Sequence, residues 1–279
     1  MSFDIFGFSV PLYGVLFWLG ILAAAAVAIF LFKKREIPLF DLVCSAIYTI
    51  IGAIIGAKLL FFIVSFSEIV EGVRAAYAAG ATVMQIVAAL MQGGFVFYGG
   101  LIGGILGLLI YCWQFKMPVL KFFDIYAVVL PFGHAFGRVG CFFGGCCYGM
   151  PYDGIFSYKY FVSPENGGAP GLLGESLFPV QLFEAFFLLV IFAAQMLIFY
   201  KKPKPYGILV VNYGVLYAIT RFVLEFFRYD AVRGVYGGLS TSQWISIALI
   251  LGAGALVLLY YLKQRKVSTV LNNEHKENT

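Results

Sequence analysis

The segment FGRVGCFFGGCCYG, residues 136–149, gathers residue types that do chemistry within an otherwise apolar chain. Arg138 carries a permanent positive charge, and its planar guanidinium can bind a phosphate through paired hydrogen bonds. His134 lies one helical turn before Arg138 and on the same helix face. A histidine titrates near neutral pH and can accept a proton there. The segment therefore predicts a site that binds an anion and can move a proton.

A second set of charges lies near the end of an apolar run. Arg221, Glu225 and Arg228 are spaced i, i+4 and i+7, which predicts that they share one helix face. A charge inside a membrane span costs about 2.5 to 3.5 kcal/mol and usually faces the protein interior or a wet cavity. An internal ion pair beside an arginine that reaches toward the interface is the simpler interpretation. Together with Arg138, the set predicts a pocket for an anionic head such as a phosphodiester.

The glycine-rich segment at residues 93–104, GGFVFYGGLIGG, allows two interpretations. Gly99 and Gly103 are four residues apart, a spacing typical of close packing between membrane helices. Gly99 and Gly100 near a helix N-terminus could also let a phosphate approach free backbone amides. In that interpretation Tyr98 stands at the mouth of the pocket.

The elements that position these residues are predicted to be membrane helices. Of 279 residues, 62% are hydrophobic and 12% charged, too little polar surface for a water-soluble globule. The mean hydropathy is +0.92. Apolar runs of about 20 residues predict about seven spans, at roughly residues 10–32, 39–66, 94–114, 122–138, 179–200, 206–226 and 242–262. The fold class is thus an all-α membrane protein, a bundle of about seven transmembrane helices.

Basic residues occupy every second loop, which predicts the orientation of the bundle. They are Lys33, Lys34 and Arg35, then Lys116 and Lys121, then Lys201, Lys202 and Lys204, then Lys263, Arg265 and Lys266. The alternate loops hold mainly acidic residues, with few basic ones. By the positive-inside rule the N-terminus lies outside and the C-terminus in the cytoplasm. These short clusters do not form the basic face that nucleic-acid binding requires, so we expect no nucleic acid partner.

The predicted organisation is a single transmembrane domain at residues 1–266 and a polar cytoplasmic tail at 267–279. The loop at residues 140–178 is long for a simple connection, and we expect it to form a small extracytoplasmic cap. Lys58 and Glu184 are further ionisable residues within predicted spans, where they should face the bundle interior or a wet cavity.

In order and spacing, five motifs resemble the prolipoprotein diacylglyceryl transferase family over nearly the whole chain. They are Tyr13-Gly14, Tyr98-Gly99-Gly100-Leu101, Gly137-Arg138-Val139-Gly140 with Gly149, Pro179-Val180-Gln181-Leu182-Phe183-Glu184, and Arg221-Phe222-Val223-Leu224-Glu225-Phe226-Phe227-Arg228. The resemblance implies a multi-pass enzyme of the bacterial inner or plasma membrane. Such an enzyme transfers the diacylglyceryl group of phosphatidylglycerol to the lipobox cysteine of a prolipoprotein at the outer leaflet and releases glycerol phosphate.

The resemblance also implies roles for individual residues. Arg138 and Arg221 are expected to handle the substrate, and Tyr13 to contribute. The expected substrate-binding set is Tyr13, Gly99, Gly100, Arg138, Gly149, Arg221, Glu225 and Arg228. We expect no cofactor.

The chain departs from the family pattern at several positions, which predicts a divergent branch. Tyr98 stands where the family has a histidine, and Cys141, Gly144 and Cys146 stand at two asparagines and a glutamate. We predict that His134 supplies the base and that Tyr98 orients the phosphate. Two alternatives stay open: a His134 that is only hydrogen-bonded inside the bundle, or a Tyr98 ionised by nearby guanidiniums. The other histidine, His275, lies in the predicted tail.

Three interpretations of Cys141, Cys146 and Cys147 stay open. They are packed or free thiols, a disulfide from Cys141 to one of the other two, and redox or metal chemistry. A closed structural zinc site needs about four ligands and only one histidine lies nearby, so we name no metal ligand. Cys44 and Cys112 are predicted to be small buried residues.

The sequence leaves two alternative functions open. The first is a phospholipid-dependent transferase with a different acceptor, such as another surface protein or a glycan. The second is a non-enzymatic transporter of small molecules. Transporters place charged sites near the membrane midplane, whereas most ionisable residues here lie toward one face.

Overall fold

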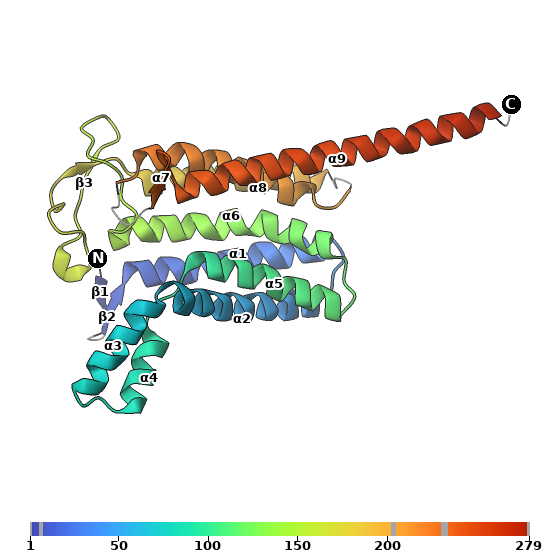
Figure 1. Ribbon diagram of the computed structural model, residues 1–279. Helices are drawn as coiled ribbons and strands as arrows, with labels where there is room; N and C mark the ends of the chain where they lie inside the picture. The colour runs from blue at the N-terminus through green and yellow to red at the C-terminus, as the bar shows by residue number, and fades with distance from the viewer. Residues whose placement is uncertain (1, 6–7, 202–204, 230–233, 278–279) are drawn as a thin grey trace. The chain divides into compact units, whose positions relative to one another are not determined.

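A computed structural model of the chain describes residues 2–5, 8–201, 205–229 and 234–277 (Figure 1). Two charges used above, Lys202 and Lys204, lie outside the described residues. The side chains of Lys263, Arg265, Lys266 and His275 also lie outside them. The orientation with the N-terminus outside, and the division into one domain at 1–266 and a tail at 267–279, stay predictions.

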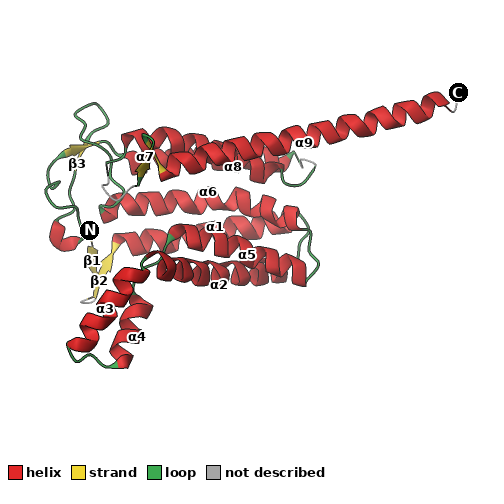
Figure 2. Cartoon of the chain, in the orientation of Figure 1, coloured by secondary structure: helices red, strands yellow, loops and turns green. Residues whose placement is uncertain are grey.

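Seven helices among the described residues are long and apolar enough to cross a membrane (Figure 2). They are α1 (Leu12–Lys34), α2 (Leu39–Val64), α5 (Phe97–Gln114), α6 (Val119–Gly144), α7 (Val180–Tyr200), α8 (Ile208–Leu224) with the 3-10 turn η2 (Glu225–Phe227), and α9 (Thr241–Glu277), whose apolar part is Thr241–Leu259. The predicted all-α membrane fold with about seven spans is confirmed. The backbone of α9 includes the predicted tail as far as Glu277.

Short elements connect these helices. The strands β1 (Ser2–Ile5) and β2 (Phe8–Pro11) pair antiparallel before α1. The strands β3 (Tyr158–Lys159) and β4 (Ser176–Leu177) pair in the predicted cap, with the 3-10 turn η1 (Pro164–Asn166) between them. The strands β5 (Val235–Tyr236) and β6 (Leu239–Ser240) pair before α9.

The fourth predicted span, residues 122–138, was too short. Helix α6 continues to Gly144, so Arg138 and Cys141 lie within the helix and not in the following loop. The charge of Arg138 interrupts the apolar run, but nothing after it prevents helical hydrogen bonding. The helix ends where Gly145 adopts a φ of +70°, a conformation that glycine tolerates best.

The chain forms two compact units. Residues 29–122 form the smaller unit, and residues 1–28 with 123–279 form the larger. In the smaller unit α2 and α5 pack backbone to backbone through glycines. A Cβ atom on Gly103 would lie 2.1 Å from the carbonyl oxygen of Gly52, and one on Gly99 would lie 2.3 Å from that of Gly56. The packing interpretation of this glycine spacing is confirmed.

Replacing Gly103 by valine is expected to lower the free energy of unfolding by about 2 kcal/mol. The clash is with backbone atoms, so no side-chain rotation relieves it. Thermal unfolding of the purified protein in detergent measures the effect. The matched control is Gly72→Ala in the same unit, where an added Cβ meets no atom within 4 Å. Equal melting temperatures for the two variants would contradict this account of the packing.

A helical hairpin, α3 (Phe66–Ala78) and α4 (Val83–Gln92), connects α2 to α5 and was not predicted (Figure 1). Thr82 and Gln85 form a capping box at the start of α4. Lys58 in α2 donates to the carbonyls of Met91, at 3.2 Å, and of Gly93, where α4 ends. A cation suits the negative end of a helix, so Lys58 is explained as a cap.

In the larger unit, a proline inside α6 is compensated by a glutamine from α7. Pro131 has no N–H, so the carbonyl of Ala127 lacks its helical donor. The buried Gln195 donates from Nε2 to this carbonyl at 3.3 Å and to that of Leu209 in α8 at 2.7 Å. One side chain thereby joins α6, α7 and α8.

A buried carboxylate fixes the start of α8. Asp124 in α6 accepts hydrogen bonds from the N–H groups of Gly207 (2.8 Å), Leu209 (3.1 Å) and Val210 (3.2 Å). These amides lie where a helix leaves donors unsatisfied and where a negative charge is favoured. Together with Gln195, this contact holds α8 against α6 at the end of α8 opposite Arg221.

The cap segment has a small core of its own. Tyr160, Val162 and Leu177 are buried against one another. The hydroxyl of Tyr160 donates to the carbonyl of Gly145 at 2.6 Å and accepts from the N–H of Ala169 at 2.9 Å. Residues 145–178, which follow α6, therefore form an element with its own core, and its place outside the membrane stays a prediction.

Candidate active site

Three helices of the larger unit converge on one buried carboxylate. Glu184 in α7 is almost completely buried and pairs with Arg138 in α6, with Nη2 and Oε1 3.1 Å apart. Tyr217 in α8 donates its hydroxyl to the same Oε1 at 3.4 Å. Directly beside them, Ala135, Ala185 and Leu188 form an apolar cluster. Because a buried charge needs a partner, Glu184 fixes the position of the Arg138 guanidinium.

His134 is the second contact of that guanidinium. Its Nε2 accepts a hydrogen bond from Nε of Arg138 at 3.2 Å. A histidine nitrogen that accepts a hydrogen bond carries no proton. His134 is therefore neutral in this arrangement, and its single ring proton is on Nδ1. The helical spacing correctly predicted that His134 and Arg138 meet. Arg138 is therefore held from two sides by His134 and Glu184.

A second guanidinium lies in the same electrostatic environment. Arg221, in the last turn of α8, pairs with Glu225, with Nη2 and Oε2 2.8 Å apart, and donates from Nη2 to Oγ of Ser242 in α9 at 3.1 Å. Both Arg138 and Arg221 interact electrostatically with Glu184. These two arginines from separate helices thus lie near one carboxylate, and that they bind a lipid phosphate together stays a prediction.

One donor group of Arg221 has no partner among the described residues. Its Nη1 is buried and makes no hydrogen bond among the described residues. A buried charged donor left unsatisfied is costly, and native proteins rarely retain one without a reason. An anionic ligand that accepts from Nη1 would supply the missing bond. Phosphate oxygens suit a guanidinium in both charge and geometry.

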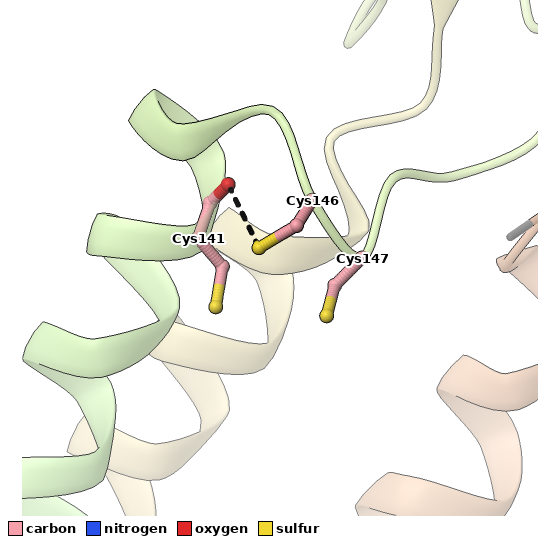
Figure 3. Close-up of side chains that lie close together, drawn as sticks. All are labelled: Cys141, Cys146 and Cys147. Carbon is pink, nitrogen blue, oxygen red and sulfur yellow. Dashed lines mark hydrogen bonds between the residues drawn. The ribbon is translucent and has the colours of Figure 1, made fainter. Parts of the chain in front are cut away.

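Three thiols lie close together at the end of α6 and in the turn after it (Figure 3). Cys141 is in the last turns of α6, and Cys146 and Cys147 are in the turn that follows, with their ligand sulfur atoms all within 4.8 Å of one another. All five cysteines lie in the described part of the chain and are free there, so the loop disulfide, one of the three interpretations, is not formed. The Arg228 and Arg138 guanidiniums lie close enough to the Cys147 thiol to interact with it electrostatically, and Sγ of Cys146 donates to the carbonyl of Cys141 at 3.8 Å.

Comparison with known proteins identifies the family of the chain. The model of the family described as prolipoprotein diacylglyceryl transferase matches residues 1–260. The chain belongs to this family.

Curated members of the prolipoprotein diacylglyceryl transferase family align over nearly their whole length. One is phosphatidylglycerol–prolipoprotein diacylglyceryl transferase 2 of Clostridium perfringens (strain 13 / Type A), 34% identical over 94% of this chain and 96% of that protein. The transferase of Clostridium tetani (strain Massachusetts / E88) is 34% identical over 89% of this chain and 92% of its own. The transferase of Campylobacter curvus (strain 525.92) is 31% identical over 96% of this chain and 95% of its own length. With seven apolar helices and bacterial relatives, the chain is a multi-pass bacterial membrane protein of this family.

Tyr13 is placed beside the site, as the family resemblance implied. It opens α1, and its ring faces α6 at Gly140 and Gly144. A Cβ atom on Gly140 would lie 3.2 Å from Cδ2 of Tyr13. Tyr13 also interacts electrostatically with Arg138. Tyr13 therefore lies near Arg138 and the last turns of α6, and its part in the reaction stays a prediction.

Arg228 does not share a helix face with Arg221 and Glu225, so the i, i+4, i+7 prediction was wrong for its last member. Helix α8 ends at Leu224, η2 covers Glu225–Phe227, and Arg228 is extended with φ −90° and ψ 150°. There it forms an isolated antiparallel bridge with Gly149. A Cβ atom on Gly149 would lie 2.2 Å from the carbonyl oxygen of Phe178, so this glycine is needed for close backbone packing.

The residues predicted from the third span belong to the smaller unit. Tyr98 is partly exposed near the start of α5, and Gly99 packs against Gly56 of α2. The amide of Gly100 already donates to the carbonyl of Val96 at 3.1 Å. Gly100 is the fourth residue of α5 and makes the first hydrogen bond of the helix. The prediction that its N–H is free to bind a phosphate was therefore wrong.

The sequence analysis did not predict that Tyr217 and Ser242 belong to the site. It placed Glu184 within a span but named no partner for its carboxylate. Tyr217 lies one turn before Arg221, a signal that helical spacing could have found. Ser242 comes from α9, and nothing in the sequence indicates that it meets Arg221.

Proposed function

We propose that this chain transfers the diacylglyceryl group of phosphatidylglycerol to the cysteine thiol of a lipobox-bearing prolipoprotein and releases glycerol phosphate. Family membership and the printed names of the relatives support this activity. The observation in this chain that carries the proposal is the buried, unpartnered Nη1 of Arg221, in the same electrostatic environment as the Arg138–Glu184 pair. The lipid phosphate would accept from Nη1.

The reaction places two demands on the site. The acceptor sulfur forms a bond to a glycerol carbon while the bond from that carbon to the phosphate oxygen breaks. The electron pair of the broken bond stays on the phosphate, so negative charge grows there, and the thiol proton must be removed. Guanidiniums fixed before the reaction stabilise that growing charge at no further cost in reorganisation. Arg221 and Arg138 fill this role, and Glu184 and Ser242 hold them in place.

The proton acceptor is a separate question. His134 was predicted as the base, but its Nε2 accepts from Arg138 in this arrangement. We therefore propose that His134 positions Arg138 and is not the group that takes the thiol proton. To position Arg138, residue 134 needs only a neutral side chain that accepts a hydrogen bond from Nε of Arg138.

Replacing His134 separates these two roles. If His134 positions Arg138, His134→Gln should keep most of the transfer rate, because the glutamine oxygen can accept from Nε of Arg138, while His134→Ala should lose about tenfold. A general base contributes about 100-fold or more, so loss of the base should inactivate both variants alike. Initial rates at saturating peptide and lipid measure the difference. A glutamine variant as slow as the alanine variant would contradict the positioning role.

The activity itself is tested with purified protein, labelled phosphatidylglycerol and a lipobox peptide. Both diacylglyceryl-peptide and released glycerol phosphate are followed over time, and they should appear in equal amounts. A peptide with serine in place of the cysteine is the control and should give neither product. Release of glycerol phosphate that does not depend on the peptide would point to another acceptor, and no release from folded protein would overturn the proposal.

A further inference from the structure

The three sulfur atoms of Cys141, Cys146 and Cys147, called here the thiol cluster, form a group that the proposed function does not yet use. Their sulfur atoms lie within 4.8 Å of one another (Figure 3). Cys146 is exposed and the other two are half-buried, so the cluster does not simply fill a core. Among the described residues, no fourth His, Cys, Asp or Glu completes the group.

Backbone contacts hold the turn that brings the sulfurs together, and Sγ of Cys146 adds a hydrogen bond to the carbonyl of Cys141 at 3.8 Å. Gly145 and Cys147 both have positive φ, +70° and +58°. A residue other than glycine keeps such a conformation only where its surroundings determine it. Here Tyr160 binds the carbonyl of Gly145, and Nε2 of the buried Gln181 donates to the carbonyl of Cys146 at 2.9 Å. The amide of Cys146 also donates to the carbonyl of Cys141 at 3.2 Å.

A pre-formed triangle of thiols suits a thiophilic metal ion better than a disulfide. A bridge between the adjacent Cys146 and Cys147 would be strained, and any single bridge leaves one sulfur over. With a Zn–S distance of about 2.3 Å, tetrahedral ligands lie about 3.8 Å apart. The spacing in the cluster needs only small side-chain movements to reach that value. Three protein ligands with one open position are the arrangement of catalytic rather than structural zinc.

The charges around the cluster also favour a metal thiolate. One Zn²⁺ with three thiolates carries a net charge of −1. The guanidiniums of Arg228 and Arg138 both interact electrostatically with Cys147. Cys141 follows Arg138 by three residues in α6, so the two side chains lie on neighbouring positions of one helix face. The positive charges of Arg138 and Arg228 would therefore offset the net charge of −1 on a zinc ion bound by the three thiolates.

We propose that the thiol cluster binds one Zn²⁺ ion and that the open fourth position takes the acceptor cysteine of the prolipoprotein as a thiolate. This inference rests on the proposed function. A thiol that coordinates zinc loses its proton, here to water. The lone pair of the bound sulfur then forms the S–C bond, the C–O bond to the phosphate breaks with its electron pair on oxygen, and zinc stays +2. This would remove the acceptor proton without a histidine at position 98.

Metal content is the first test. Protein purified without chelators should contain about one zinc per chain, measured by mass spectrometry of the metal. Cys146→Ser should lose most of this zinc, and because Cys146 is exposed the fold should tolerate the change. Cys44→Ser, outside the cluster, is the matched control and should keep it. Circular dichroism and size-exclusion elution confirm that each variant is folded. Folded wild-type protein that binds no zinc would overturn the inference.

Cobalt substitution tests the open position. Co²⁺ in the cluster should show thiolate-to-cobalt charge transfer and the d–d bands of a tetrahedral site. Adding the lipobox peptide should change the d–d bands, and the serine peptide should not. Unchanged bands at saturating cysteine peptide would overturn the role of the fourth position.

The two proposals fail in different ways. Chelated, zinc-free protein that transfers diacylglyceryl at the full rate would overturn the zinc inference and leave the proposed function intact. Zinc protein that responds to the peptide but never releases glycerol phosphate would overturn the proposed function and leave the metal site. If both hold, removing zinc should lower the transfer rate by about tenfold or more, and added zinc should restore it.

Discussion

Replacing Arg221 by lysine is expected to lower the rate of diacylglyceryl transfer by about 100-fold or more. Nη2 of Arg221 is occupied by Glu225 and Ser242, while the buried Nη1 has no partner among the described residues. A lysine keeps the charge but offers a single ammonium in place of a planar fork. It can satisfy Glu225 or reach the phosphate, but it cannot hold both in the same geometry. Most of the stabilisation of the growing phosphate charge should therefore be lost.

The rate is measured as product formed per folded chain at saturating phosphatidylglycerol and peptide. Arg74→Lys, an exposed arginine on α3, is the matched control and should keep the wild-type rate. Ser242→Ala removes one contact of Arg221 and should cost less than the lysine substitution. A wild-type rate in Arg221→Lys would show that the unpartnered nitrogen plays no part in catalysis.

Hydropathy predicted the membrane helices well, because an apolar run of sufficient length has few alternatives to a helix in a bilayer. It failed at the end of α6, where the single charge of Arg138 interrupts the apolar run but the helix continues to Gly144. Apolarity measures which segments can contact lipid, and hydrogen bonding decides where a helix ends. The α3–α4 hairpin was missed for a related reason, since these helices are too short to span a membrane.

The site was predictable where its residues share one helix and unpredictable where they do not. His134 and Arg138 meet because one turn separates them, and the chemistry of their side chains drew attention to the pair. Arg228 was misplaced because a helical period was extended past Leu224, where the helix tightens and ends. The contacts of Arg138 with Glu184 and of Arg221 with Ser242 depend on how three further helices pack, which no local pattern encodes.

The conformation of the turn that carries Cys146 and Cys147 could not be predicted from the sequence either. The sequence shows three cysteines near one another, but their sulfurs converge because Tyr160 and Gln181 hold the intervening carbonyls. Tyr160 belongs to the cap and Gln181 to α7. The position of the thiol cluster beside the arginines therefore follows from tertiary contacts of residues that carry no reactive group.

Replacing Glu184 by leucine is expected to lower the free energy of unfolding by about 3 to 5 kcal/mol and to abolish transfer. Glu184 is almost completely buried, and its loss leaves the largely buried charge of Arg138 without its carboxylate partner. The freed guanidinium would also lose the contact that orients it, so catalysis fails even in the molecules that remain folded. Thermal unfolding in detergent and the transfer assay measure the two effects, with Glu175→Leu on the exposed surface of the cap segment as the control.

A double variant, Glu184→Leu with Arg138→Met, separates stability from catalysis. Removing both charges leaves no unpaired ion, and an apolar pair in place of a buried ion pair is often neutral or stabilising. The double variant should therefore recover most of the lost stability while its transfer rate stays at background. Recovery of activity along with stability would mean that Arg138 serves only to neutralise Glu184. Failure to recover stability would mean that Glu184 supports the fold mainly through Tyr217, its other partner in α8.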